Sequence, residues 1–149
     1  MNAWNNSGIS QVMVEQVDFN STEKYGIVDP CVKDISTFES IPLRGLIEKP
    51  SPEDAPSNLA LLGRYILSPK LFNLLVDLKP GVGGEVQLTD GLSKLLSLDG
   101  LNGLKTDADI YDCGNKLGFL SANLAVGMGD ANSRAALHAL FKKLIDNEF

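Results

Sequence analysis

Four short apolar runs lie in the first half of this chain, and they constrain its fold more than any other feature. The first run, SQVMVEQV at residues 10–17, carries three valines and a methionine. A run of this kind suits a strand covered on both faces better than an amphipathic helix. The other runs have the same character: 25–29 (YGIVD), 41–49 (IPLRGLIEK) and 59–67 (LALLGRYIL). The sequence therefore predicts four strands before residue 68.

Beyond residue 67 the apolar residues change to helical spacing. Ser68 and Pro69 predict a helix start, as N-cap and first-turn proline, and Pro80 with Gly81 predicts its end. The apolar positions between them recur as one helical face: Leu71, Phe72, Leu74, Leu75 and Leu78. A glycine loop then opens into a second helix, whose apolar face is Leu88, Leu92, Leu95 and Leu96.

The last third of the chain predicts one or two short strands within residues 101–115 and two further helices. One helix begins near Lys116, and the last is capped by Asn132 or Ser133. Strands followed by helices, then a strand and more helices, indicate an α/β domain with a mixed sheet. With no repeat and no internal linker, residues 1–149 are expected to form a single domain.

Composition excludes several classes of protein. A net charge of −6 with scattered Lys and Arg argues against a nucleic-acid binder. The longest uncharged stretch of the second half, residues 117–129, is too short to span a membrane. The N-terminal MNAWNNSGIS has no basic region followed by an apolar core, so it is not expected to be a signal peptide. A cytoplasmic location is the expectation.

Glu48 and Lys49 end the third apolar run and are followed by Pro50. Adjacent strand residues point to opposite faces, but a turn at the strand end can bring both into the crevice where α/β sheets bind ligands. A carboxylate accepts hydrogen bonds from vicinal sugar hydroxyls, and an ammonium neutralises a phosphate. The alternative is a solvated strand end with no binding role.

Five segments in register resemble a known family: YGIVD, GLIEKP, APSNLALLGRYILSP, PGVGGEVQLTDGL and YDCGNKLGFLSA. They are similar to bacterial UTP–glucose-1-phosphate uridylyltransferases, and the resemblance weakens only in the last twenty or so residues. It implies the nucleotide-diphospho-sugar transferase fold, a Rossmann-like mixed sheet. It also implies the conversion of UTP and glucose 1-phosphate to UDP-glucose and pyrophosphate with Mg²⁺, without a covalent protein nucleophile.

The resemblance assigns roles to individual residues. It implies that Glu48 binds glucose hydroxyls, that Lys49 is catalytic and binds the sugar-side phosphate, and that Gly26 lets its backbone approach the sugar. Asp112 matches a magnesium-binding aspartate, whose partner aspartate has no counterpart here. Read without the resemblance, Asp112 is a turn or helix-capping residue. Gln87 and Asp90 are expected to contact the binding residues and not the ligand itself.

Family members are about twice this long, and no glycine-rich GxGTR-like loop for the triphosphate occurs in this sequence. The chain therefore resembles the carboxyl-terminal, sugar-binding half, and the nucleotide-binding amino-terminal half is absent from it. The favoured hypothesis is part of a uridylyltransferase that is inactive alone. The alternatives are a regulatory paralogue that associates with a full-length enzyme, and a sugar-phosphate-binding module.

The same hypothesis bears on assembly. Half of a sheet exposes strand edges and apolar faces, so the chain is expected to form a homo-oligomer, a dimer, or to be covered by a full-length enzyme. Glucose 1-phosphate or UDP-glucose is the expected small-molecule partner.

Overall fold

The computed structural model describes residues 2–33, 35–80 and 84–146. Its contacts group the chain into two compact units, Met1–Asp107 and Ala108–Phe149, which are described separately below. The expectation of one domain over residues 1–149 stays a prediction.

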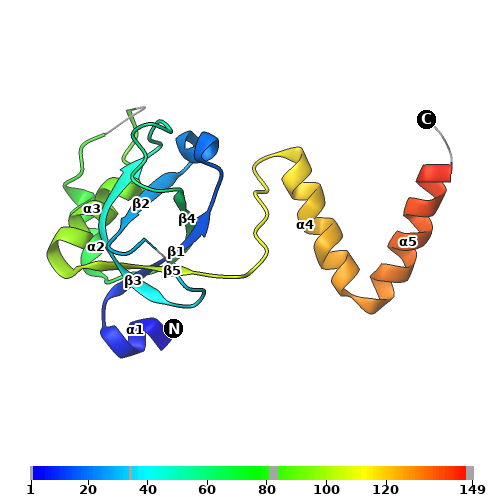
Figure 1. Ribbon diagram of the computed structural model, residues 1–149, viewed down its shortest axis with the longest axis horizontal. Coiled ribbons are helices and arrows are strands. Elements are labelled where there is room, and N and C mark those ends of the chain that lie inside the picture. Colours follow the sequence, from blue (N-terminus) through cyan, green and yellow to red (C-terminus); the bar gives the residue numbers. More distant parts are fainter. Residues whose placement is uncertain (1, 34, 81–83, 147–149) are drawn as a thin grey trace. The chain divides into compact units, whose positions relative to one another are not determined.

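The first unit contains all the described strands and the helices α2 and α3 (Figure 1). Its elements are α1 Asn2–Ser7, β1 Ser10–Gln16, the 3₁₀ helix η1 Phe19–Lys24, β2 Gly26–Pro30, β3 Ser40–Glu48, β4 Leu59–Ile66, α2 Lys70–Val76, α3 Leu88–Asp99 and β5 Leu101–Lys105. The predicted strands and helices of this region are confirmed. The structure also contains α1 and η1, which the sequence pattern does not predict because six residues each are too few to show a hydrophobic period.

The five described strands form a closed ring in the order β1, β4, β2, β3, β5. β1 and β5 are parallel and every other pair is antiparallel, so the sheet is mixed as expected. The ring closes because β3 is nine residues long and pairs twice. Its end from Leu43 to Glu48 pairs with β2, and its start from Ser40 to Pro42 pairs with β5. These strands therefore do not form an open Rossmann-like sheet with free edges.

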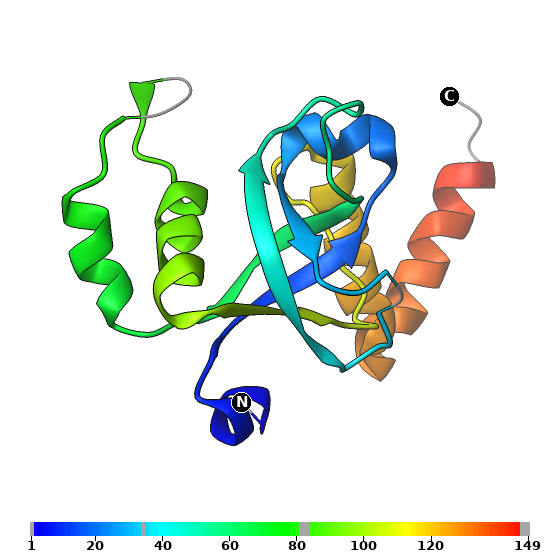
Figure 2. The same cartoon turned by 60° about the vertical axis from the view of Figure 1, so that its left-hand side comes forward.

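The core lies inside this unit, between the barrel and the helices. α3 packs on β3 and α2 packs on α3, so both helices lie on one side of the barrel, as Figure 2 shows. Leu92 and Leu95 of α3 are fully buried, as the helical spacing predicts. They pack with side chains from the strands and α2: Val12, Val14, Val28, Ile41, Leu43, Leu59, Leu71 and Leu101.

The second unit consists of a turn and two packed helices, α4 Lys116–Gly129 and α5 Ala131–Asp146. The last helix begins one residue before the predicted caps. Asp130 supplies the cap instead, because its carboxylate accepts hydrogen bonds from the Ser133 backbone N at 2.8 Å and the Ser133 hydroxyl at 2.7 Å. The hydrogen bond from the Ser133 hydroxyl has the larger effect and the one from its backbone N the smaller, and both hold the pKa of Asp130 below its usual value. No helix of the described chain combines the length and apolar character needed to cross a membrane.

Candidate functional site

Glu48 is held where two strands meet. In the antiparallel β2–β3 ladder Glu48 lies directly opposite Gly26, and the register shifts between Asp29 and Pro30. Residues two apart on a strand share a face, so Glu48 shares its face with Leu46, which packs against the core. Glu48 is consequently half-buried, although it is the last residue of its strand.

Thr89, in the first turn of α3, meets this carboxylate. Its hydroxyl donates a hydrogen bond to Oε2 of Glu48 over 2.5 Å, and the Thr89 residue is only 7% exposed. A hydrogen bond to a carboxylate is stronger than one between neutral groups and fixes its direction. Each carboxylate oxygen has two lone-pair positions, so Oε1 and one position of Oε2 stay open to a ligand.

Gly26 completes the cluster from β2. A Cβ atom at this position would lie 3.1 Å from Glu48 Oε2, 3.1 Å from Thr89 Oγ1 and 2.9 Å from Leu61 Cδ1. The absence of a side chain is therefore what allows the carboxylate and the hydroxyl to approach the β2 backbone. We name this Gly26–Glu48–Thr89 convergence the carboxylate cluster.

Lys49 leaves the strand in a different direction. Its φ of 49° lies in the left-handed region, which ends the extended conformation of β3. Its backbone N donates to the carbonyl oxygen of Tyr25 at 3.0 Å, so the turn is anchored to the residue before β2. The Lys49 side chain is exposed. The structure contains the predicted turn at the strand end, but Glu48 faces inward and Lys49 faces solvent, so the expectation that both side chains line one crevice stays a prediction.

Tyr65 of β4 belongs to the surroundings of Glu48. Burial, and secondly the negative charge of Glu48, raise the pKa of the Tyr65 hydroxyl above its usual value. The group is therefore neutral at physiological pH and can donate a hydrogen bond. Neither Tyr65 nor Thr89 is among the site residues expected from the sequence. The QLTD segment indicates that residues near the start of α3 lie close to the site. Gln87 and Asp90 are the residues expected there from the sequence, but Thr89 makes the contact with Glu48.

Asp112 lies in the second unit, in a turn that leads into α4. Its Oδ1 accepts from the Gly114 backbone N at 2.9 Å, and its Oδ2 accepts from Asn115 Nδ2 at 3.2 Å. Asn115 in turn caps α4, because its Oδ1 accepts from the Gly118 backbone N at 2.8 Å. The turn-forming interpretation of Asp112 is confirmed. Its exposed carboxylate keeps free lone pairs, so a metal-binding role stays a prediction.

The side chains of the described residues can be compared with the ligands that Mg²⁺ requires. In the described part of the chain, no three His, Cys, Asp or Glu side chains gather closely enough to hold a metal ion by themselves. Mg²⁺ is usually bound through one or two carboxylates, with substrate phosphates and water completing its shell. A single hard-oxygen ligand such as Asp112 fits that pattern as one contact of a shared ion.

Gly118 fixes the position of Asp112. A Cβ atom on Gly118 would overlap the Asp112 carbonyl oxygen and lie 2.8 Å from its carbon. We expect Gly118→Ala to displace the turn and to destabilise the second unit by about 1–3 kcal/mol, the usual cost of overpacking. Thermal unfolding followed by circular dichroism measures the loss, and the Gly114 amide exchange rate reports the turn. Gly129→Ala is the control, since nothing lies within 4 Å of its Cβ. Equal effects of the two substitutions would contradict the expectation.

Comparison with known proteins places these residues in a family. The pattern of the family described as Nucleotidyl transferase matches residues 2–128. A UTP–glucose-1-phosphate uridylyltransferase of Staphylococcus epidermidis is 35% identical over 144 residues, which are 97% of this chain and 49% of the relative. One from Escherichia coli K12 is 40% identical over 122 residues, 82% of this chain and 40% of the relative.

Solved structures agree with the sequence comparison. The UDP-glucose pyrophosphorylase from Acinetobacter baumannii superimposes with a TM-score of 0.83 at 35% identity, covering 96% of this chain and 48% of that one. A UDP-glucose pyrophosphorylase complexed with UDP-glucose gives 0.77 at 32% identity over 87% of this chain and 48% of its own. The chain spans about half the length of the relatives it matches. The family pattern covers most residues of this chain, so the chain belongs to the nucleotidyl transferase family.

Proposed function

We propose that this chain supplies the sugar-phosphate-binding part of a uridylyltransferase, which converts UTP and glucose 1-phosphate to UDP-glucose and pyrophosphate. The carboxylate cluster is the observation that carries the proposal. Thr89 directs Oε2 of Glu48 and leaves Oε1 for vicinal hydroxyls of glucose. The names of the matched relatives support the choice of substrates. The role proposed for Gly26 is to let the sugar approach the β2 backbone.

Lys49 is the proposed catalytic contact. Its exposed side chain belongs to the residue that follows Glu48, and the proposed role of its ammonium is to neutralise the phosphate of a sugar that the carboxylate holds. A phosphate oxygen of glucose 1-phosphate attacks the α-phosphorus of UTP in line. The new O–P bond forms as the bond from the α-phosphorus to the bridging oxygen breaks, and pyrophosphate leaves with that electron pair. Positioning and charge neutralisation carry such a reaction, and no covalent protein nucleophile takes part.

The proposed metal is Mg²⁺, with Asp112 as one ligand. When bound, the ion supplies positive charge that neutralises the phosphate oxygens of the substrates. The contribution of this chain is the orientation of the Asp112 carboxylate, which the hydrogen bonds from Gly114 and Asn115 hold in place.

The test separates binding from turnover. Titration calorimetry with glucose 1-phosphate is expected to show binding that Glu48→Gln weakens, since an amide accepts fewer hydroxyl hydrogen bonds than a carboxylate. A chain that does not bind glucose 1-phosphate would contradict the proposal. In a pyrophosphate-release assay with UTP and Mg²⁺, we expect no turnover by these 149 residues alone. Turnover that disappears in Asp112→Ala would overturn that expectation.

Thr89 offers a sharper test of the carboxylate cluster. Thr89→Val keeps the shape of the side chain but removes the donor to Glu48, whereas Thr89→Ser keeps the hydroxyl. A hydrogen bond to a charged group contributes roughly 1.5–3 kcal/mol, so Thr89→Val is expected to weaken glucose 1-phosphate binding about tenfold or more. Calorimetry on the two variants measures the difference. Equal affinities of the valine and serine variants would remove Thr89 from the site.

We also propose that the chain self-associates. Of the two features expected from the sequence, open strand edges and exposed apolar faces, only the second supports this. The described strands close into a ring, so the open sheet edges assumed above do not support it. Exposed apolar side chains remain in both units, including Phe72 at 72%, Val76 at 82% and Val126 at 76%. Large exposed apolar groups favour association, with a second copy or with a full-length enzyme. Light scattering that finds only monomer at high concentration would contradict the homo-oligomer.

A further inference from the structure

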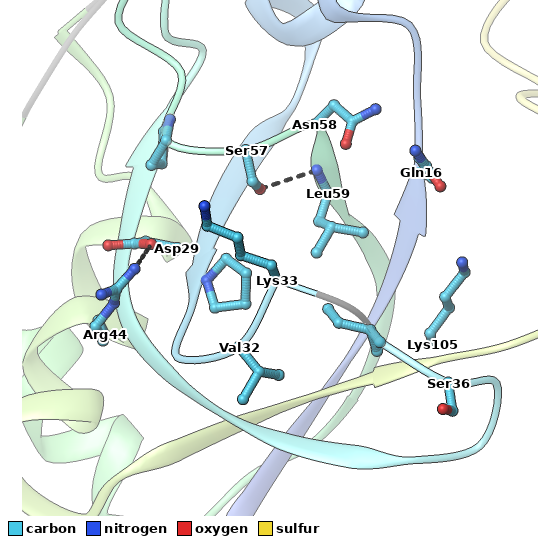
Figure 3. A pocket seen from close by; sticks show the side chains of 13 residues that line it. Gln16, Asp29, Val32, Lys33, Ser36, Arg44, Ser57, Asn58, Leu59 and Lys105 are labelled. Carbon is cyan, nitrogen blue, oxygen red and sulfur yellow. Dashed lines mark hydrogen bonds and ion pairs between the residues drawn. The ribbon is translucent and has the colours of Figure 1, made fainter.

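A separate pocket of about 470 Å³ lies in the first unit (Figure 3), and its described lining residues include none of the carboxylate cluster. Gln16 and Lys105, the last residues of the parallel strands β1 and β5, form part of its wall. The other described lining residues come from the end of β2 and the segment after it, from β3 (Arg44), and from residues 56–59, which lead into and begin β4. Ligands of α/β sheets commonly bind beyond the carboxyl ends of parallel strands, and the volume is that of a small-metabolite site.

The charges that line this pocket are mainly positive. Its described lining residues include Lys33, Arg44 and Lys105 but a single carboxylate, Asp29. Arg44 and Asp29 neutralise one another through an ion pair of 2.9 Å. The two lysines have no ion-pair partner among the described residues, so the described lining residues carry a net positive charge in a chain of net charge −6. A concave positive surface raises the local concentration of anions.

The two lysines lie at different places in the pocket. In Figure 3, Arg44 lies at the left, Lys33 near the middle and Lys105 at the right. Lys105 is half-buried, which reduces the screening of its charge by water. Because Lys33 and Lys105 reach the pocket from different segments of the chain, a ligand with two anionic groups can present one group to each lysine.

Part of the lining of this pocket consists of polar, uncharged side chains. Asn58 donates from Nδ2 to the carbonyl oxygen of Val17 at 2.9 Å, which holds its amide in place and leaves Oδ1 to accept from a hydroxyl. Ser57 is fixed by bonds to Val28 and Leu59, so that wall is preorganised. The Gln16 amide and Ser36 hydroxyl supply further donors at the rim.

We propose that this pocket binds a small polyhydroxylated metabolite with two anionic groups, of the sugar bisphosphate class, at a site distinct from the carboxylate cluster. Lys33 contacts one phosphate and Lys105 the other, and Asn58 accepts from a hydroxyl between them. The proposal depends on the charges and walls of the pocket and does not require the function proposed for Glu48 and Lys49.

The test uses glucose 1,6-bisphosphate as the probe and glucose 6-phosphate as the one-anion comparison, titrated into the whole chain at low salt. The bisphosphate is expected to bind at least fivefold more tightly, and its affinity should fall as salt is added. Lys33→Met and Lys105→Met should each weaken it about tenfold, the scale of a charge-assisted hydrogen bond. Lys143→Met, which removes an exposed charge from α5, should change nothing.

Two outcomes would overturn the proposal. One is a parent chain that gives no binding heat with the bisphosphate at millimolar concentration. The other is an affinity that Lys33→Met/Lys105→Met leaves intact and Lys49→Ala abolishes, which would place the probe at the carboxylate cluster. Circular dichroism of each variant checks folding. Because glucose 1-phosphate binding is measured on the same variants, failure here is distinguishable from failure of the function proposed above.

Discussion

Replacing Leu92 with alanine is expected to lower the free energy of unfolding of the first unit by about 3 kcal/mol. Leu92 is fully buried on α3 and packs in the core between helix and barrel. Truncation removes apolar contacts and leaves a cavity that the ring of strands cannot fill by moving, and leucine-to-alanine changes at such positions cost about 2–5 kcal/mol. Urea unfolding followed by circular dichroism measures the change, as a lower midpoint at an unchanged slope.

The same helix provides a matched control. Leu98 is also a leucine of α3, but 64% of it is exposed. Leu98→Ala is expected to change the free energy of unfolding by less than about 0.5 kcal/mol, as surface substitutions usually do. If the two variants lost similar stability, the packing of α3 against the barrel described here would be wrong.

Replacing Lys49 with alanine is expected to weaken glucose 1-phosphate binding by about 1.5–3 kcal/mol, roughly 10- to 150-fold. The reason is the loss of the ammonium proposed to neutralise the sugar phosphate. Calorimetry measures the affinity, and Lys49→Arg is expected to recover part of it because it restores the charge.

Lys94 is the control for charge in this experiment. It is exposed on α3, and Lys94→Ala changes the net charge of the chain by the same amount. Its affinity for glucose 1-phosphate should equal that of the parent. A Lys49→Ala variant that also binds like the parent would remove Lys49 from the site and would leave the function without its proposed phosphate contact.

Much of the secondary structure could be predicted because its causes are local. The apolar runs became β1 to β4, and the leucine spacing after Pro69 and after the glycine loop became α2 and α3. The Asp112 turn was also predictable, since its partners Gly114 and Asn115 lie two and three residues away. The cap of the last helix was placed wrongly because Asp130, Asn132 and Ser133 are all good capping residues.

The candidate site could be predicted only in part. Glu48 and Lys49 are candidates from the sequence because a charge pair ends an apolar run, and Gly26 follows from the resemblance to a family. Thr89 was missed because it lies 41 residues from Glu48 in the sequence, and no local pattern links the two. The pocket that Lys33 and Lys105 line could not be predicted for the same reason, since these two lysines lie far apart in the sequence.

The sequence by itself determined which segments are strands and helices, and that a carboxylate and an ammonium follow one another at a strand end. These features arise from side-chain period and from turn chemistry, which act over a few residues. Only the tertiary structure decided that the strands close into a ring, that Glu48 faces Thr89, and that two distant lysines share a pocket. These features depend on strand register and helix packing, which are set by contacts between residues far apart in the chain.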